Sequence, residues 1–346
     1  MLYFENDYCE GAHPAILQKL TETNFEKVSG YGTDPYCASA KEKIRAACAC
    51  PEADVFFISG GTQANSIVIA SMLHRWEGVI AAATGHVAGH EAGAIEFTGH
   101  KVIGLPQKNG KLDAATVEDF CKTFYADSNH DHMVFPGMVY ISHPTEAGTL
   151  YTKAELTELY DTCRRYGLPL FIDGARLGYG LAADESDMTL PEFARLCDVF
   201  YIGGTKVGAL FGEAVVIMNE SLKKDFRFIM KQRGGRLAKG RLLGIQFDAL
   251  FTDDLYFKIS RHAIEMAHQI RDIFVSAGYP LLFDSPTNQQ YPIMPDAELA
   301  EIGKSFGYEY WERVDETHSG VRFCASWATT QENVDALREA VNALKK

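Results

Sequence analysis

The chain has 346 residues, enough for one large domain with a smaller one, and its 47% hydrophobic and 23% charged residues are ordinary for a globular protein. The formal net charge of -13 argues against nucleic-acid binding, because displacing the counterions of a polyanion requires clustered Lys and Arg. No apolar run approaches the length of a membrane span.

The 8 cysteines are scattered, and most lie inside apolar or helical patterns, as small hydrophobic residues would. No secretory signal precedes them, so we expect reduced thiols and a cytoplasmic protein. Cys48 and Cys50 have no second cysteine pair at a zinc-site distance. We interpret them as structural residues and expect no metal.

Apolar runs rich in β-branched and aromatic residues alternate with helical patterns through most of the chain. The predicted strands cover residues 55–59, 78–83, 101–105, 137–142, 170–173, 198–202 and 214–218. The main predicted helices cover residues 14–26, 39–49, 64–74, 113–125, 153–166, 255–277 and 331–345. The alternation predicts an α/β protein. We expect a large, mostly parallel seven-stranded sheet domain with an N-terminal arm (residues 1–250) and a small C-terminal α+β domain (residues 251–346).

Gly60, Gly61 and Thr62 form a turn between a predicted strand and a long apolar helix. The start of a helix presents free backbone N–H groups and the positive end of the helix dipole to an anion. The turn therefore predicts a phosphate cradle, although such turns also occur only to pack a helix against a sheet.

Two histidines follow the next predicted strand. His86 and His90 are four residues apart, which puts both rings on one face of a helix and is also a metal-ligand spacing. A third ligand at a recognisable spacing is missing, and Glu91 does not lie between the histidines as it would in a zinc protease. A metal-binding or regulatory module remains the non-enzymatic alternative.

The stretch from Leu170 to Met218 organises the rest of the chain. A buried strand ends at Asp173, and about thirty residues later a second apolar strand leads to Lys206 among glycines. Ends of neighbouring strands in an open α/β sheet are where such folds bind ligands. An acid and a lysine are therefore expected to meet there.

This pair suggests pyridoxal 5'-phosphate as cofactor. Burial lowers the pKa of a lysine and frees its amine to form a Schiff base, which here would form at Lys206. A carboxylate such as Asp173 keeps the pyridine nitrogen protonated, so that the ring can accept electrons. The alternative is that Asp173 caps a turn and Lys206 is a solvated loop residue.

Arg322 lies inside the apolar run Val321–Trp327 near the C-terminus. A buried arginine is costly unless it is paired. We therefore expect Arg322 either in a buried ion pair or as a clamp for an anionic ligand, and we favour the clamp.

The Asp-Gly-Ala-Arg-Leu segment that starts at Asp173, followed by Lys206 after the next strand, resembles the low-specificity L-threonine aldolases. These are β-eliminating lyases with the aspartate-aminotransferase fold and pyridoxal phosphate as cofactor. Further similarities are the Tyr31-Gly-x-Asp-Pro turn, the Gly-Thr-x-Ala-Asn segment after Gly60, and Lys231-x-x-Gly-Gly. Together they extend over nearly the whole chain.

The resemblance implies a role for each matching residue. The implied cofactor-binding residues are Gly60, Gly61, Thr62, His86, Asp173, Arg176, Lys206 and Lys231. Gly60 replaces the family's serine, so the backbone would bind the phosphate. Lys231 would reach the cofactor phosphate of a neighbouring subunit. The implied catalytic residues are Lys206, His86 and Asp173.

The implied substrate-binding residues are Asn6, Tyr31, His132, Arg176 and Arg322. Asn6 replaces a serine in the family's N-terminal arm, and the Tyr31 loop would help to build the site across a subunit interface. His132 is the better match for a second histidine near the substrate hydroxyl, although a solvated loop histidine would look the same. Arg322 and Arg176 would hold the substrate carboxylate.

The resemblance implies cleavage of L-threonine or L-allo-threonine to glycine and acetaldehyde by a homodimer or homotetramer. The substrate is a small β-hydroxy-α-amino acid, and neither nucleic acid nor a membrane is an expected partner. A β-eliminating lyase or an amino-acid racemase of the same fold is the alternative, because Lys206 and Asp173 serve those reactions equally well.

Overall fold

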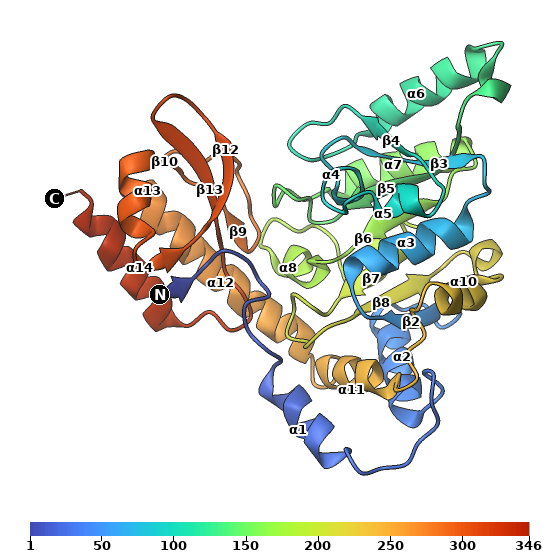
Figure 1. The fold of residues 1–346 in the computed structure, drawn as a ribbon, viewed down its shortest axis with the longest axis horizontal. Coiled ribbons are helices and arrows are strands. Elements are labelled where there is room, and N and C mark those ends of the chain that lie inside the picture. The colour runs from blue at the N-terminus through green and yellow to red at the C-terminus, as the bar shows by residue number, and fades with distance from the viewer. Residues whose placement is uncertain (346) are drawn as a thin grey trace.

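The computed structural model describes residues 1–345 and contains a large and a small unit joined through the long helix α12 (Leu255–Ser276), as Figure 1 shows. Within residues 1–345, no helix combines the length and the apolar composition needed to cross a membrane.

The large unit is built on a seven-stranded sheet. Its strands are β2 (Asp54–Ile58), β3 (Glu77–Ala82), β4 (Val102–Leu105), β5 (Phe135–Ser142), β6 (Leu170–Asp173), β7 (Val199–Gly203) and β8 (Glu213–Ile217). They lie in the order β2-β8-β7-β6-β5-β3-β4, where β8 is antiparallel to both β2 and β7 and the other neighbouring pairs are parallel. The predicted mostly parallel seven-stranded sheet is confirmed, and β6 and β7 are neighbours as expected.

Helices cover both faces of this sheet (Figure 1). Alternate residues of a strand point to opposite faces, so Val139 and Ile141 of β5 join one core while Met138 and Tyr140 join the other. The first core also contains buried residues of α2 (Pro35–Ala47), α6 (Ala114–Ala126), α7 (Lys153–Arg165) and α11 (Arg241–Leu250). The second contains those of α3 (Gly61–Met72) and α10 (Phe226–Gln232).

Local signals explain where several of these helices begin. At α7, the Thr152 hydroxyl accepts a hydrogen bond from the Glu155 backbone N–H, and the Glu155 carboxylate accepts one from the Thr152 N–H. Asp34 caps α2 in a similar way, with Pro35 in the first turn. The shorter elements are α1 (Pro14–Glu22), α4 (His86–Gly89), α5 (Ala94–Phe97), α8 (Leu177–Ala182), α9 (Leu190–Ala194), η1 (His130–His132) and η2 (Glu220–Leu222).

The small unit packs α12, α13 (Asp296–Ile302) and α14 (Gln331–Ala343) around a short sheet. Its strands are β9 (Gln289–Gln290), β10 (Ile293–Pro295), β12 (Glu309–Arg313) and β13 (His318–Cys324). The N-terminal strand β1 (Leu2–Tyr3) pairs with β11 (Phe306–Gly307), and Phe4 is buried in the small unit's core. The start of the arm thus packs with the small unit, although the prediction counted it with the large one. The boundary after residue 250 stays a prediction.

Candidate active site

A cavity of about 330 Å³ lies where the parallel strands of the large unit end. The predicted residues among those that line it are Gly60, Gly61, Thr62, His86, Asp173, Arg176 and Lys206. They come from segments following β2, β3, β6 and β7, because the carboxyl ends of parallel strands share one edge of the sheet. The structure therefore brings together seven residues that are spread over 147 positions of the chain.

The N-terminus of α3 forms one wall of this cavity. Gly60 precedes the helix in an extended conformation, and no side chain caps the helix there. The first N–H groups of a helix have no partners within the helix, so those of Gly61 and Thr62 are donors for a ligand. A Cβ on Gly61 would lie 3.1 Å from the Tyr201 hydroxyl oxygen, so a side chain there would crowd the wall. This wall suits a phosphate group.

Asp173 is buried at the end of β6. Its Oδ2 accepts hydrogen bonds from the Tyr140 hydroxyl at 2.6 Å and the Asn65 amide at 3.2 Å, and its Oδ1 accepts one from the Ala175 N–H at 3.0 Å. Burial opposes ionisation, but the positive charge of His86 and these hydrogen bonds outweigh it and lower the pKa of Asp173. A buried carboxylate kept ionised can hold a protonated ring nitrogen.

Lys206 lies in the turn between β7 and β8, and the Tyr179 hydroxyl donates to its backbone carbonyl at 2.5 Å. Burial lowers the pKa of Lys206, and the nearby Arg176 lowers it further, whereas the carboxylates of Asp7, Asp173 and Glu213 oppose this. The neutral amine, which is the form that attacks a carbonyl, is therefore more highly populated than in a solvated lysine.

Two glycines allow β6 and β7 to end close together. A Cβ on Gly174 would lie 1.9 Å from the Tyr201 carbonyl oxygen, and one on Gly203 would lie 2.1 Å from the Ala175 carbonyl oxygen. Both obstacles are backbone atoms, so neither can turn aside. Glycine is required at both positions to keep Asp173 and Lys206 in one cavity.

His86 begins α4 and lines the cavity. Its Nδ1 lies 2.8 Å from Oε1 of Glu91, and its backbone N–H donates to Glu146 at 2.9 Å. Burial lowers the pKa of His86, but the hydrogen bond to Glu91 and the charge of Asp173 outweigh it, so the pKa is raised overall. The ring is therefore a candidate for proton transfer within the cavity.

Two further carboxyl groups line the cavity: Glu146, whose position the sequence indicated only as near the site, and Glu213, which was not predicted. Glu146 accepts hydrogen bonds from the Ser142 hydroxyl at 2.6 Å and from His86. Glu213 accepts one from the Thr205 hydroxyl at 2.8 Å, and burial raises its pKa to about 8. A carboxylate at the first position of a buried strand was the sequence signal that could have identified Glu213.

Arg176 is held by Asp7 of the N-terminal arm. Nε and Nη2 of Arg176 donate to the two oxygens of Asp7 at 2.7 and 3.0 Å, and both side chains are largely buried. Asn6, beside Asp7, does not line the cavity; its amide oxygen accepts a hydrogen bond from the Tyr8 N–H at 3.0 Å. Tyr8 itself lines the cavity, so the arm closes one side of it.

Arg322 lies in β13 with 9% of its surface exposed, and it does not line the cavity. Its Nη1 donates to Gln289 at 3.0 Å, and its Nη2 donates to the Glu5 carbonyl at 2.9 Å and lies 3.5 Å from Glu309. Its Nε has no hydrogen-bond partner within the described part of the chain. Within the chain the ion-pair partner of Arg322 is the half-exposed Glu309, so the expected buried ion pair is not formed in full, and the clamp stays a prediction.

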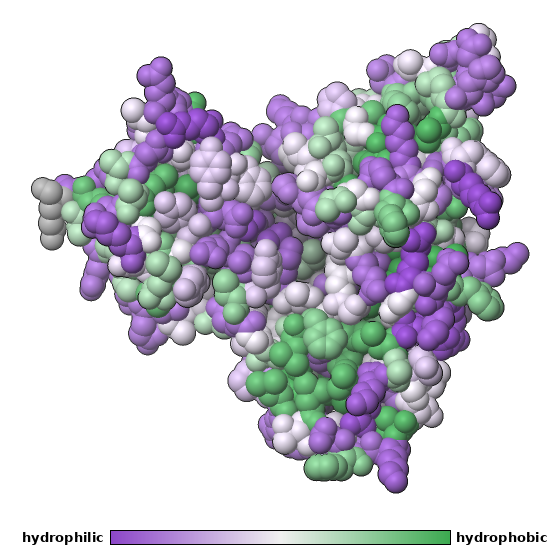
Figure 2. All heavy atoms as spheres, in the orientation of Figure 1, coloured by the Kyte–Doolittle hydropathy of each residue, from purple (hydrophilic) through white to green (hydrophobic). Residues whose placement is uncertain are grey.

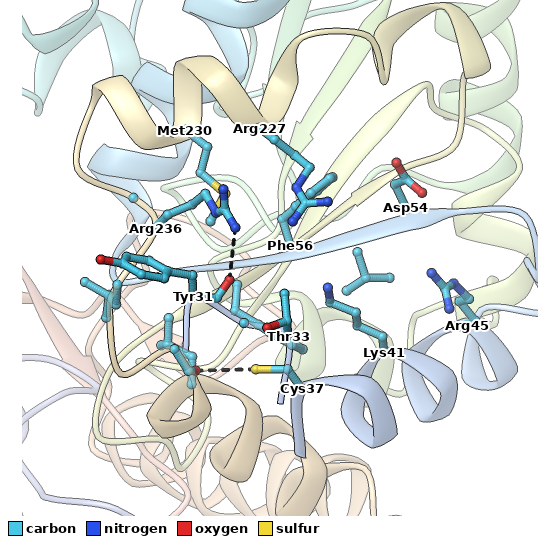
Figure 3. Close-up of a pocket in the computed structure, with 17 residues that line it drawn as sticks. Tyr31, Thr33, Cys37, Lys41, Arg45, Asp54, Phe56, Arg227, Met230 and Arg236 are labelled. Atoms are coloured by element: carbon cyan, nitrogen blue, oxygen red, sulfur yellow. Dashed lines mark hydrogen bonds between the residues drawn. The ribbon is translucent and has the colours of Figure 1, made fainter. Parts of the chain in front are cut away.

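Tyr31 lines a second pocket, which lies along β2 between α2 and α10 (Figure 3), and Lys231 lies beside Tyr31. The Lys231 amine lies 4.6 Å from the centre of the Tyr31 ring, and Tyr31 is 47% exposed. The cationic residues that line this pocket are Lys41, Arg45, Arg227 and Arg236. Neither Tyr31 nor Lys231 reaches the first cavity within one chain.

His132 does not fit its predicted role in substrate binding. It ends η1, just before β5 begins at Phe135, and its side chain is 78% exposed. The cavity lies at the opposite end of β5, beyond Ser142, and a strand of this length spans about 25 Å. The loop that carries His132 lies at the amino end of β5, and the sequence pattern alone did not indicate this position.

No group of three His, Cys, Asp or Glu side chains in residues 1–345 is arranged to hold a metal ion. The His86 and His90 rings lie 5.9 Å apart between centres, and the polar contact of His86 is with Glu91.

Comparisons with known proteins give a consistent result. The family model described as beta-eliminating lyase matches residues 7–339. A low specificity L-threonine aldolase of Pseudomonas aeruginosa is 30% identical over 96% of this chain and 95% of its own length. The structure of a Leishmania major threonine aldolase is 42% identical with a TM-score of 0.97, and the match covers 100% of both chains. Aspartate aminotransferase of Thermus thermophilus shares the fold, with a TM-score of 0.71 at 14% identity over 100% of this chain and 91% of that one.

Proposed function

The chain belongs to the beta-eliminating lyase family, and we propose that it cleaves L-threonine and L-allo-threonine to glycine and acetaldehyde with pyridoxal 5'-phosphate. The observation that carries the proposal is the meeting of Asp173 and Lys206 in one cavity, within a chain that matches a threonine aldolase structure over its full length. The reaction is a retro-aldol cleavage of the Cα–Cβ bond.

The donor set of the cavity fits the cofactor. The backbone N–H groups at Gly60, Gly61 and Thr62 would hold the phosphate, with no side chain in the way at Gly60. The ionised Asp173 would hold the protonated ring nitrogen, and the amine of Lys206 would bind the aldehyde carbon covalently. When bound, the cofactor supplies an electron sink for the pair released from the breaking bond.

The remaining polar groups would bind and orient the substrate. We propose that Arg176, fixed by Asp7, binds the substrate carboxylate together with Arg322, and that Asn6 supports the arm beside them. Fixing the carboxylate sets the orientation of the bonds at Cα and thereby selects which of them breaks. His86 would accept the proton of the β-hydroxyl as the Cα–Cβ bond breaks.

We propose that the enzyme is a homodimer or homotetramer in the cytoplasm. All 8 cysteines are free thiols, as a reducing compartment requires. Tyr31 and Lys231 lie together on the surface, where they can complete a neighbouring subunit's site. Figure 2 shows apolar side chains gathered over α11, and such a surface can form a subunit contact. Size-exclusion chromatography with light scattering tests this proposal, and a stable, active monomer would contradict it.

The reaction is tested by mixing the purified protein with pyridoxal phosphate, recording its visible spectrum and measuring acetaldehyde released from both threonine diastereomers. Borohydride reduction should fix the cofactor on the protein, and peptide mass spectrometry should locate it on Lys206. The Lys206→Ala variant should lose both the attachment and aldehyde release, whereas Lys108→Ala, at an exposed lysine, should keep them. Bound cofactor without aldehyde release would contradict the aldolase reaction and favour elimination or racemisation.

A further inference from the structure

We propose that Glu91 is the positioning residue that sets the protonation and orientation of His86 for proton transfer from the substrate hydroxyl. This inference rests on the proposed function, because it concerns the histidine to which that reaction assigns the proton. Glu91 itself does not line the cavity. It acts through His86.

Glu91 is a buried carboxylate with specific partners. The residue is 6% exposed and its side chain is fully buried. Its Oε1 lies 2.8 Å from Nδ1 of His86 and accepts a hydrogen bond from the Asn65 amide at 2.6 Å. Its Oε2 has no hydrogen-bond partner within residues 1–345, so the contacts of Oε1 with His86 and Asn65 are the ones that stabilise this buried carboxylate.

The contact determines which nitrogen of His86 carries a proton. An ionised carboxylate only accepts hydrogen bonds, so Nδ1 must donate to Glu91. In the neutral imidazole, Nε2 then keeps its lone pair and is the acceptor. Because the His86 side chain is 36% exposed and lines the cavity, the ring remains accessible to a substrate. The other tautomer would leave no basic nitrogen available.

Asn65 connects this pair with the carboxylate at the cofactor ring. Its amide nitrogen donates to Glu91 at 2.6 Å and to Asp173 at 3.2 Å, so both amide hydrogens are used. This arrangement bridges the two buried carboxylates and offsets part of the repulsion between their like charges. The geometry of His86 is thereby tied to that of Asp173.

Charged and titratable groups from several elements surround His86. Glu91 contacts the ring, Asp173 of β6 and Lys206 face it, Glu146 accepts the His86 backbone N–H, and the His90 ring lies 5.9 Å away. After the opposing effect of burial, the hydrogen bond to Glu91 is the largest influence on the pKa of His86 and raises it. Loss of the Glu91 charge should therefore lower this pKa.

The test compares Glu91→Gln with Glu96→Gln in the holoenzyme. Glu96 is an exposed residue five positions away, so its variant removes the same charge without contacting His86. The acidic limb of the kcat/KM profile should move to lower pH in Glu91→Gln, because the imidazolium loses a partner. At its optimum this variant should lose up to about 100-fold in kcat with KM little changed, because the proton transfer at His86 is weakened. Glu96→Gln should match the wild type.

A second readout is independent of the reaction. Titration of the His86 ring by NMR with 13C-labelled histidine, assigned with a His86→Asn variant, should show a lower pKa in Glu91→Gln than in the wild type. Glu91→Asp keeps the charge and should restore the higher pKa. An unchanged His86 pKa in Glu91→Gln, or a loss that is equal in the Gln and Asp variants, would overturn the proposal. A wild type that titrates as expected but releases no aldehyde would instead contradict the proposed function.

Discussion

Asp7 and Arg176 are 169 positions apart in the chain, and they form a two-point ion pair with N–O distances of 2.7 and 3.0 Å. The pair fastens the N-terminal arm to the segment that follows β6. Burial opposes the charge on Asp7, but the guanidinium of Arg176 and the Lys206 amine lower its pKa to about 2.

Asp7→Asn should lower the free energy of unfolding by about 3–5 kcal/mol, because it leaves the buried guanidinium of Arg176 unpaired. Since the folded-state pKa of Asp7 is depressed from 3.8, its stabilisation is present above pH 4 and disappears as the pH falls towards 2. Urea unfolding at several pH values measures both effects. As a control, Asp184→Asn breaks an exposed pair with Arg261 and should cost less than about 1 kcal/mol. Equal losses in the two variants would contradict the role of burial.

His132→Ala should leave kcat/KM for threonine within about twofold of the wild type, because its exposed side chain lies at the edge of the sheet opposite the cavity. His86→Ala should reduce kcat/KM by about a hundredfold or more, because it removes the proposed proton acceptor. Steady-state kinetics of both variants measures these two effects on kcat/KM. A similar loss in both would show that His132 reaches a site in the assembled enzyme.

Glu213→Gln should reduce the pH dependence of stability. The folded-state pKa of Glu213 is raised from 4.5 to about 8, so the protein takes up a proton on folding, and stability falls as the pH rises through this range. The slope is up to about 1.4 kcal/mol per pH unit, and glutamine cannot titrate. Urea unfolding at pH 6 and pH 8 should show a smaller difference in the variant than in the wild type. Glu185→Gln, at an exposed position, should retain the wild-type slope.

Gly174→Ala should destabilise the protein by more than about 3 kcal/mol or prevent its folding, because the new Cβ would lie 1.9 Å from the Tyr201 carbonyl oxygen. The obstacle is backbone in a buried strand and cannot rotate away. Gly11→Ala meets nothing within 4 Å and serves as the control. Thermal unfolding and soluble yield measure the effect. A folded Gly174→Ala variant with normal stability would mean that β6 and β7 can separate without cost.

Much of the fold could be predicted because its signals are local. The seven strands of the large sheet stand out as short apolar runs, and the predicted helix starts at Pro14 and Lys153 agree with those of α1 and α7. The meeting of Asp173 and Lys206 also followed from the sequence, because the rule that parallel strands end at one edge needs no knowledge of distant contacts.

What only the tertiary structure decided were the partners of these residues. The periodicity of a strand or helix tells which face a side chain is on, but not which distant side chain it touches there. Nothing in the local pattern paired Asp7 with Arg176, or Asn65 with both Glu91 and Asp173, and nothing placed His132 at the far edge of the sheet. Those relationships depend on how the arm, the helices and the loops pack in three dimensions. The sequence by itself determined the sheet and the acid–lysine pair, while packing decided which groups hold and tune them.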